Sequence, residues 1–357
     1  MSEVKLMKGN EVIAEAAIRC GCDGYFGYPI TPQSEVMETL MARKPWEETG
    51  MVVLQAESEI AAINMVYGGA SCGKKVMTSS SSPGISLKQE GLTYIAGSEL
   101  PCLVVDVVRG GPGLGTIQPA QSDYFQATKG GGHGDYHLIV LAPASVQEMN
   151  DFVDLGFELA FKYRNPAMIL ADGVIGQMME KVQLSPVKPR WTDKEIEKIS
   201  GSWALTGKSN RERHVITSLE LEAHRQEVFN EKLQYKYRKI EENEVRFEKI
   251  QCDDAEYLLV AYGSSARICQ KSMQLAREEG IKVGLLRPIT LYPFPTKAIA
   301  EMAGQVKGML AVEMSAGQMV EDVRLAVNGR VKVEHYGRMG GVVPTPEEIV
   351  EALKNKF

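Results

Sequence analysis

Apolar positions in the first half of the chain switch repeatedly between helical spacing and short continuous runs. The short runs predict strands at 24–26, 52–54, 75–78, 102–108, 137–141 and 167–171. Helical spacing predicts helices at 9–19, 32–41, 58–72, 84–97 and 145–162. Because strands that alternate with helices form βαβ units, this order predicts an α/β fold with a doubly wound parallel sheet. Such a sheet binds its ligand outside the carboxyl ends of its strands.

The pattern changes after Val182 and changes again near Tyr257. Residues 182–250 contain prolines, two tryptophans and a densely charged stretch, and they predict a linker followed by a helix. Apolar residues of that helix recur at roughly helical spacing, which favours partial packing across the two flanking units or against a partner over a nucleic-acid arm. These residues are Val228, Leu233, Tyr237 and Ile240. A solvated connecting helix is the favoured interpretation.

A second and shorter alternation of strands and helices begins near Tyr257 and predicts a second α/β unit. We therefore expect two domains, at 1–181 and 251–357, with the linker between them. Gly263, Ser264 and Ser265 stand at a strand-to-helix turn, where free amides bind an anion or cap the helix. Without the full glycine fingerprint, capping is the favoured interpretation.

Composition and charge narrow the class of protein. The hydrophobic fraction is 44% and the charged fraction 24%, as in globular proteins, and the net charge of −6 argues against nucleic-acid binding. The polar start predicts no signal peptide, and no apolar run approaches the length of a membrane span, so we expect a soluble cytoplasmic protein. Six cysteines never form Cys-x-x-Cys, so we expect this chain to bind no metal cluster. Cys20 and Cys22 are expected to be reduced, structural thiols.

The segment 27–34 carries candidate chemistry, because Pro29 and Pro32 break the strand and hold Thr31 between them. Glu57 and Glu59 follow the next apolar run, so two strands deliver polar groups to one edge of the sheet. For Glu59 the alternative is a carboxylate that only stabilises a helix N-terminus, and Glu57 is the weaker candidate for a catalytic role.

Arg109 follows the strand at 102–108, which places its planar guanidinium at the same edge. A run of serines, 79–82, ends another strand and opens a helix, where hydroxyls either line a pocket or cap the helix. His133, His137 and Asp123 are acid–base candidates, although the neighbouring glycines favour a purely structural loop.

These motifs occur in an order that resembles the alpha chain of the 2-oxoacid:ferredoxin oxidoreductases, which are thiamine-diphosphate enzymes. The resemblance rests on YFGYPITPQS, on QAESEIAAINMVYGGASCGKKVMTSSSSPG and on VVDVVRGGPGLGTIQPAQSDYFQATKGGGHGDYH. It implies a pyrimidine-type thiamine-diphosphate domain at 1–181 and a second domain like the carboxyl-terminal domain of transketolase. The loop at 121–135 looks most like the branched-chain (2-oxoisovalerate) type, and the 2-oxoglutarate type ranks second.

The resemblance also implies roles for individual residues. Glu59 matches the glutamate that hydrogen-bonds N1′ of the cofactor's aminopyrimidine, a task that suits a half-buried carboxyl. Thr31 matches a threonine near the substrate carbonyl, and Arg109 matches an arginine that pairs with the substrate carboxylate. The alternatives are a helix cap for Thr31 and a surface ion pair for Arg109. The cofactor pocket is expected to be lined by Tyr28, Pro29, Ile30 and Ser81.

No Gly-Asp-Gly with a later asparagine, the usual magnesium motif of thiamine enzymes, is found, and Asp172-Gly173 lacks the preceding glycine. A partner beta chain is therefore expected to supply the diphosphate site, Mg²⁺ and, by resemblance, an iron–sulfur cluster. The resemblance further implies ferredoxin and coenzyme A as partners, and gamma or delta chains stay open.

Three other functions are compatible with parts of the sequence. A Rossmann dehydrogenase is disfavoured because no Gly-x-Gly-x-x-Gly follows the first strand. A non-catalytic assembly or decarboxylase-related subunit stays open, as does a non-redox thiamine synthase, although such a synthase ordinarily carries its own magnesium motif.

Overall fold

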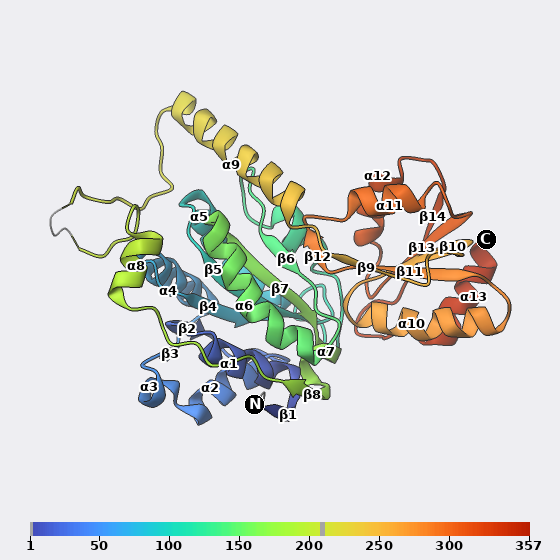
Figure 1. The fold of residues 1–357 in the computed structure, drawn as a ribbon, viewed down its shortest axis with the longest axis horizontal. Coiled ribbons are helices and arrows are strands. Elements are labelled where there is room, and N and C mark those ends of the chain that lie inside the picture. Colours follow the sequence, from blue (N-terminus) through green and yellow to red (C-terminus); the bar gives the residue numbers. More distant parts are fainter. Residues whose placement is uncertain (1–2, 208–210) are drawn as a thin grey trace.

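A computed structural model describes residues 3–207 and 211–357 as two α/β units that lie side by side (Figure 1). The larger unit holds a sheet in the order β12-β6-β7-β5-β4-β2-β3, whose strands are parallel except for β12. This arrangement confirms the predicted α/β fold with a doubly wound sheet. Its strands are β2 (Gly24–Gly27), β3 (Val52–Gln55), β4 (Val76–Ser80), β5 (Cys102–Val108), β6 (Ile139–Leu141), β7 (Pro166–Asp172) and β12 (Thr290–Tyr292).

Helices cover both faces of this sheet because successive side chains of its buried strands point to opposite faces. On β4, the Ser79 hydroxyl bonds Gln33 beside α2, whereas the Ser80 hydroxyl lies under Gly84 of α5. One group of helices is α1 (Gly9–Arg19), α2 (Ser34–Arg43) and α6 (Val146–Tyr163), and the other is α4 (Glu59–Ser71) and α5 (Ser82–Gly97). Shorter helices are α3 (Pro45–Glu48), α7 (Gly173–Gln177) and the π-helix η1 (Gln126–Gly130).

The smaller unit has a five-stranded sheet in the order β14-β13-β10-β11-β9, in which β9 alone is antiparallel. The strands are β9 (Phe247–Ile250), β10 (Tyr257–Val260), β11 (Val283–Pro288), β13 (Gly308–Glu313) and β14 (Lys332–Gly337). The helices are α10 (Gly263–Glu278), α11 (Thr296–Met302), α12 (Met319–Val327) and α13 (Pro346–Lys356). A second cluster of buried apolar side chains lies between this sheet and α10 and α13.

Two strands cross the expected division of the chain. The segment 247–250, expected to belong to the linker, forms the edge strand β9 of the smaller sheet. Conversely, β12 belongs to the second unit in sequence but pairs with β6 of the larger sheet, where Tyr292 faces Val140. Strand β12 therefore extends the sheet of the larger unit, whereas β9 extends the smaller unit back into the expected linker.

The connecting segment contains α8 (Asp193–Ser200) and α9 (Ala223–Asn243). Helix α9 is drawn in yellow at the top of Figure 1, and α8 lies at the left, beside α4. Helix α9 buries Leu233, Tyr237 and Ile240 against the larger unit, whereas Val228 is half exposed. Lys232 and Lys236 of α9 form ion pairs with one carboxylate at the α5–β5 turn, Glu99. The helix is thus partly packed, as its apolar spacing predicts.

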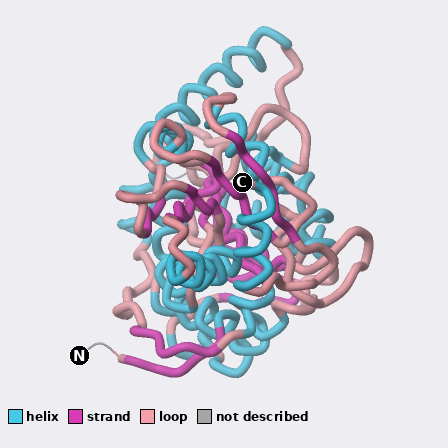
Figure 2. Tube along the Cα trace, turned by 90° about the vertical axis from the view of Figure 1, so that its right-hand side faces the viewer, coloured by secondary structure: helices cyan, strands magenta, loops and turns pink. Residues whose placement is uncertain are grey.

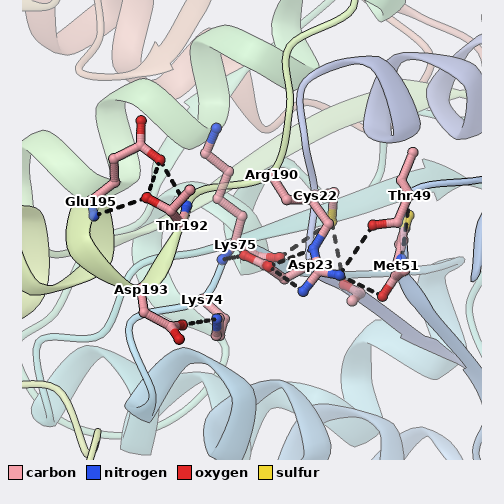
Figure 3. A network of polar contacts seen from close by, with 12 residues as sticks. Cys22, Asp23, Thr49, Met51, Lys74, Lys75, Arg190, Thr192, Asp193 and Glu195 are labelled. Atoms are coloured by element: carbon pink, nitrogen blue, oxygen red, sulfur yellow. Dashed lines mark hydrogen bonds and ion pairs between the residues drawn. The ribbon is translucent and has the colours of Figure 1, made fainter.

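The first part of the connecting segment is fixed at the amino ends of β2 and β4 (Figure 3). Arg190 donates from Nε to Asp23 Oδ1 at 2.8 Å and from Nη1 to the Thr49 carbonyl at 3.2 Å. The other Asp23 oxygen accepts the Lys75 amide at 2.9 Å. This network lies at the edge opposite to the one where parallel sheets bind ligands.

Seen from the side of the smaller unit, a two-stranded ribbon near the N-terminus runs along the bottom of the molecule (Figure 2). It pairs β1 (Val4–Lys8) with β8 (Met179–Gln183) in antiparallel register. Within 3–207 and 211–357, no helix combines the length and the apolar composition needed to cross a membrane.

Candidate active site

The candidate residues gather at the carboxyl edge of the larger sheet because they follow four neighbouring parallel strands. The segment 28–33 follows β2, and Glu59 follows β3 after a short turn. Ser81 follows β4 directly, and Arg109 follows β5. The structure therefore brings together the strand ends on which the sequence motifs stand.

The turn after β2 is held from inside the protein by one side chain, Gln33. Its backbone amide donates to Ile30 O at 3.0 Å and its side-chain amide to Tyr28 O at 3.3 Å. Its amide oxygen accepts from Ser79, whose hydroxyl also contacts the buried Tyr25 hydroxyl at 2.7 Å. These bonds fix a turn in which Tyr28 and Ile30 are partly exposed.

Pro29 and Thr31 are exposed on the outer side of the turn. The next carbonyl, that of Pro32, accepts side-chain amides from Asn10 at 2.6 Å and from Gln177 at 2.9 Å. The exposed segment therefore rests on a rigid base, and its outer surface is free to meet a ligand.

Arg109 bonds directly to this turn. Its side chain is 8% exposed, and Nη1 donates to Thr31 O at 3.0 Å while Nη2 donates to Leu114 O at 2.9 Å. The guanidinium has five N–H donors, and its buried Nε has no acceptor among the described residues. An unpartnered charged donor in a buried place indicates a site for a further acceptor, such as an anion.

Glu59 is the first residue of α4 and is 7% exposed. Ser58 caps this helix by accepting the Ala61 amide at 3.2 Å and donates its hydroxyl to the exposed Glu57 at 3.1 Å. The two competing glutamates thus differ: Glu57 faces solvent, and Glu59 faces α5. A Cβ added to Gly84 of α5 would come within 2.9 Å of Glu59 Oε1, so the glycine makes room for this carboxylate.

The segment 80–84 connects Glu59 to Arg109. The same added Cβ at Gly84 would meet Ser80 Oγ at 2.1 Å, and the Ser82 hydroxyl accepts the Arg109 amide at 3.1 Å. Ser81 precedes α5 and is fully buried, and its hydroxyl makes no cap bond and has no partner among the described residues. Buried hydroxyls without protein partners are places for a ligand or bound water.

Two buried charged residues near this edge, Lys88 and Asp106, are not among the candidate residues that the sequence suggests. Lys88 lies fully buried on α5 and donates from Nζ to the Glu59 carbonyl at 3.3 Å. Burial lowers the pKa of its ammonium to about 8, a shift that the nearby Glu59 opposes. One feature of the sequence indicates the position of Lys88: it stands four residues after Gly84 and so lies on the same face of the helix.

The second is Asp106, which interrupts the apolar strand β5 and is fully buried beside Asp123. Burial raises the pKa of Asp106 well above its ordinary range, and the neighbouring Asp123 adds to this increase. Burial also raises the pKa of Asp123. Since carboxylates only accept, a hydrogen bond between the two requires a shared proton. Asp123 is therefore half of a buried acid pair.

The two histidines occupy other places. His133 is exposed, and its carbonyl accepts the Thr93 hydroxyl. His137 stacks on Tyr292 with ring centroids 4.2 Å apart and meets Tyr237 edge-on, and burial lowers its pKa. His137 thus joins β12 and α9 to the larger unit.

The turn at Gly263 binds a carboxylate of the protein itself, that of Asp172. Asp172 accepts the Ser264 hydroxyl at 2.6 Å and its amide at 3.1 Å. The same carboxylate caps α7 through the Val174 amide at 2.9 Å. Asp172 and Ser264 therefore link the two units.

Known proteins resemble the chain over nearly its whole length. Residues 15–248 match the thiamine-diphosphate-binding domain of pyruvate flavodoxin/ferredoxin oxidoreductase, and residues 255–349 match core domain II of pyruvate:ferredoxin oxidoreductase. The ketoisovalerate oxidoreductase subunit VorB of Methanothermobacter thermautotrophicus is 50% identical over 98% of this chain and 97% of its own length. The 2-oxoglutarate synthase subunit KorA of Methanothermobacter marburgensis is 35% identical over 99% of both chains.

A solved structure agrees with these matches. The 2-oxoglutarate:ferredoxin oxidoreductase of Magnetococcus marinus, with 2-oxoglutarate, coenzyme A and succinyl-CoA bound, superposes with a TM-score of 0.87 at 29% identity. The superposition covers 99% of this chain and 65% of that longer chain. Sequence and fold thus confirm the resemblance that the motifs indicate, and the chain belongs to the family of 2-oxoacid:ferredoxin oxidoreductases, as one of their subunits.

Proposed function

We propose that this chain is the subunit of a thiamine-diphosphate-dependent oxidoreductase that converts branched-chain 2-oxoacids, such as 2-oxoisovalerate, to acyl-CoA, CO₂ and reduced ferredoxin. The observation that carries the proposal is the 50% identity to a ketoisovalerate oxidoreductase subunit over 98% of this chain. The second candidate is oxidation of 2-oxoglutarate. It is supported by the 2-oxoglutarate synthase subunit at 35% identity and by the solved 2-oxoglutarate enzyme.

Glu59 fits the aminopyrimidine end of thiamine diphosphate. Its carboxylate is buried against Gly84, and no hydrogen bond from the described residues occupies it. Bound thiamine diphosphate supplies the carbanion chemistry that a decarboxylation needs, and the protein supplies orientation and proton control. In this proposal Glu59 shares a proton with N1′ in the hydrogen bond that fixes the ring, while Tyr28, Pro29, Ile30 and Ser81 line the same pocket.

Thr31 and Arg109 are proposed to hold the substrate. Thr31 is exposed at the rim, and Arg109 Nη1 fixes its carbonyl. The remaining donors of Arg109, including the unpartnered Nε, suit the carboxylate of a 2-oxoacid. Binding at one end by Arg109 would place the 2-oxo carbon beside Thr31.

The surface around the site supports a partner subunit. Leu114 and Ile117 follow Arg109 and are 83% and 56% exposed, and Ile60 of α4 is exposed beside Glu59. Apolar side chains gathered at a functional edge mark a protein interface. We propose that a beta subunit covers this edge and carries the diphosphate site, Mg²⁺ and an iron–sulfur cluster. Ferredoxin and coenzyme A act on the assembled complex, with or without gamma and delta subunits.

The roles of the two glutamates can be separated by matched variants. In the complex with its partner subunits, Glu59→Gln should lower 2-oxoacid-dependent viologen reduction by a factor of about 100 or more, because the ring-binding carboxylate is lost. Glu57→Gln, on an exposed side chain two residues away, should leave the rate within about twofold of the unmodified complex. Equal rates for the Glu59→Gln and unmodified complexes would contradict the proposed role of Glu59.

A further inference from the structure

The loop that follows Arg109 lies against a turn of the smaller unit. At the base of this loop, 110–118, the Gly110 amide donates to the Gln118 carbonyl at 2.9 Å and closes it. The tip is exposed and includes Leu114, whose carbonyl accepts a hydrogen bond from Arg109 Nη2 at 2.9 Å. The position of this carbonyl therefore depends on what holds the base of the loop.

The turn of the smaller unit stands between β14 and α13. It consists of Gly340 and Gly341, which both lie in the left-handed region, with φ of +64° and +98°. Before the turn, Arg338 forms an ion pair with Glu348 of α13, and after it Pro344 is buried. The turn is thus held by its own unit on both sides and offers a fixed surface to the loop.

The backbones of the loop and the turn approach so closely that neither leaves room for a side chain. A Cβ added to Gly110 would lie 2.9 Å from the Gly340 carbonyl carbon and from the Gly341 nitrogen. A Cβ added to Gly341 would lie 2.4 Å from Gln118 Cβ and 3.0 Å from the Thr116 methyl carbon. Glycine on both sides is therefore a condition of this contact.

The contact reaches the guanidinium of Arg109 through one hydrogen bond. Arg109 Nη1 donates to Thr31 O at 3.0 Å, and Nη2 donates to the Leu114 carbonyl on the loop. A planar guanidinium held at both Nη atoms has a fixed orientation, and so has its buried Nε, which has no acceptor among the described residues. Displacement of the loop would remove the second acceptor and leave the guanidinium free to turn.

We propose that Gly341 is a positioning residue for Arg109: it lets the smaller unit hold the loop 110–118 in the place where Leu114 orients the guanidinium toward the substrate carboxylate. This inference rests on the proposed function, in which Arg109 binds that carboxylate. Gly341 acts through the loop and touches neither substrate nor cofactor. The smaller unit, which carries none of the proposed site residues, thereby contributes to the affinity for the 2-oxoacid.

The test compares KM and kcat for 2-oxoisovalerate, and the Kd of thiamine diphosphate, in variants of the assembled complex. Gly341→Ala should raise KM by about tenfold or more, because the new methyl group displaces the loop. Tenfold corresponds to about 1.4 kcal/mol, close to the lower limit for one hydrogen bond to a charged group. Both kcat and the Kd of thiamine diphosphate should stay within about threefold, because only substrate binding is weakened and Glu59 stands on another element.

Two further variants separate the contact from backbone strain in the turn. Thr116→Ser removes the methyl group that faces the glycines and keeps the hydroxyl, which accepts the Gln118 amide at 3.2 Å. It adds no atoms, so it tests the contact even where Gly341→Ala fails to assemble, and it should raise KM by about threefold. Adding Gln118→Gly to Gly341→Ala removes the Cβ that clashes and should return KM to within about threefold of the unmodified complex.

Gly329 offers a matched control in the same unit. It also lies in the left-handed region, with φ of +74°, but a Cβ added there would meet nothing within 4 Å. Gly329→Ala should therefore introduce strain of the same kind without moving the loop, and KM should stay within about twofold.

Several results would overturn the inference. One is an unchanged KM in Thr116→Ser together with an unchanged KM, or failed assembly, of Gly341→Ala. Others are an equal rise of KM in Gly329→Ala, or a rise in Gly341→Ala that Gln118→Gly does not reverse. A parallel loss of thiamine-diphosphate affinity would also contradict it, because that would indicate a general disturbance of the chain.

Arg109→Met tests the proposed function separately. It should raise KM at least as much as Gly341→Ala does, because the donors for the substrate carboxylate are lost. An unchanged KM in Arg109→Met would overturn the proposed role of Arg109 itself. A raised KM in Arg109→Met, with no change in the Gly341 and Thr116 variants, would overturn the role of Gly341 alone.

Discussion

Burial of the Lys88 ammonium lowers the free energy of unfolding, and replacement of Lys88 should show by how much. Burial lowers the pKa of its ammonium from 10.5 to about 8 in the folded chain. Between these two pH values the unfolded chain binds the additional proton, so this residue makes the free energy of unfolding rise with pH in that window. Below pH 8 the full cost is present, and the shift corresponds to about 3 kcal/mol.

Lys88→Met should therefore raise the free energy of unfolding by about 3 kcal/mol at pH 7, and by only about 1 kcal/mol near pH 9.5. Methionine keeps the length of the side chain, so packing should be preserved. Urea unfolding of both proteins at the two pH values measures the difference. An increase in the free energy of unfolding that does not depend on pH, or a decrease at pH 7, would show that the buried ammonium does not destabilise the folded chain.

Individual residues differ in how far the sequence predicts them. Thr31 and Arg109 stand next to prolines and glycines that break strands, so their place at the sheet edge is visible in the sequence, and the structure joins them by a hydrogen bond. Lys88 stands inside helix α5 and Asp106 inside strand β5. A charged residue inside such an element is usually expected on its solvent-exposed face. Both side chains are buried by the packing of other elements against them, and hydrophobic periodicity along the sequence does not reveal such packing.

The packing of α4 against α5 sets the position of Glu59, and it depends on two glycines of α5. Gly91 lies against Ile63, where a Cβ would come within 2.5 Å of the Ile63 side chain, and Gly84 lies against Glu59. The helices approach closely because these positions lack side chains. The glycines of α5 are thus a requirement of this close approach.

Gly84→Ala should weaken thiamine-diphosphate binding by about tenfold or more, because the new methyl group displaces the Glu59 carboxylate or the Ser80 hydroxyl. Overpacking at this place should also destabilise the chain by about 1 to 3 kcal/mol. Gly68→Ala on α4 is the control: its Cβ would meet nothing within 4 Å, so helix propensity predicts a small stabilisation. Calorimetric titration of the complex with thiamine diphosphate measures the affinity. Equal affinities for both variants would refute this packing role.

Longer helices and strands were predictable because their periodicity is local. The ranges 9–19 and 102–108 coincide with α1 and β5. The strands β9 and β12 escaped prediction for a physical reason. β9 is an edge strand whose residues are mostly exposed, and β12 is stabilised by pairing with β6, about 150 residues earlier in the chain. Non-local pairing leaves no periodic trace in so short a segment.

The two α/β units are joined by buried polar contacts as well as by the pairing of β12 with β6. Gln121 of the larger unit accepts the Ser265 hydroxyl at 2.6 Å and the Met314 amide at 3.0 Å, and Asp172 binds Ser264. Tyr124 donates to Asp322 at 2.5 Å in the same interface. The smaller unit thus supports the loop that carries Asp123 and follows Arg109. The boundaries at 181 and 251 remain a proposal.

Substrate preference belongs to the assembled enzyme, because the partner subunit is expected to complete the pocket. Apolar pockets discriminate by about 1 to 3 kcal/mol per methylene, whereas an unpaired buried carboxylate is strongly disfavoured. A pocket for a branched apolar side chain should therefore discriminate against 2-oxoglutarate more strongly than the difference in size between the two substrates predicts. The reason is that the side-chain carboxylate of 2-oxoglutarate would be buried without a partner.

The decisive measurement is viologen reduction by the chain co-expressed with its partner subunits, with kcat/KM determined for 2-oxoisovalerate, 2-oxoglutarate and pyruvate in the presence of coenzyme A. We expect the value for 2-oxoisovalerate to exceed the other two by about tenfold or more. A higher kcat/KM for 2-oxoglutarate would favour the second candidate function. Reduction that proceeds without thiamine diphosphate would contradict the account of the site itself.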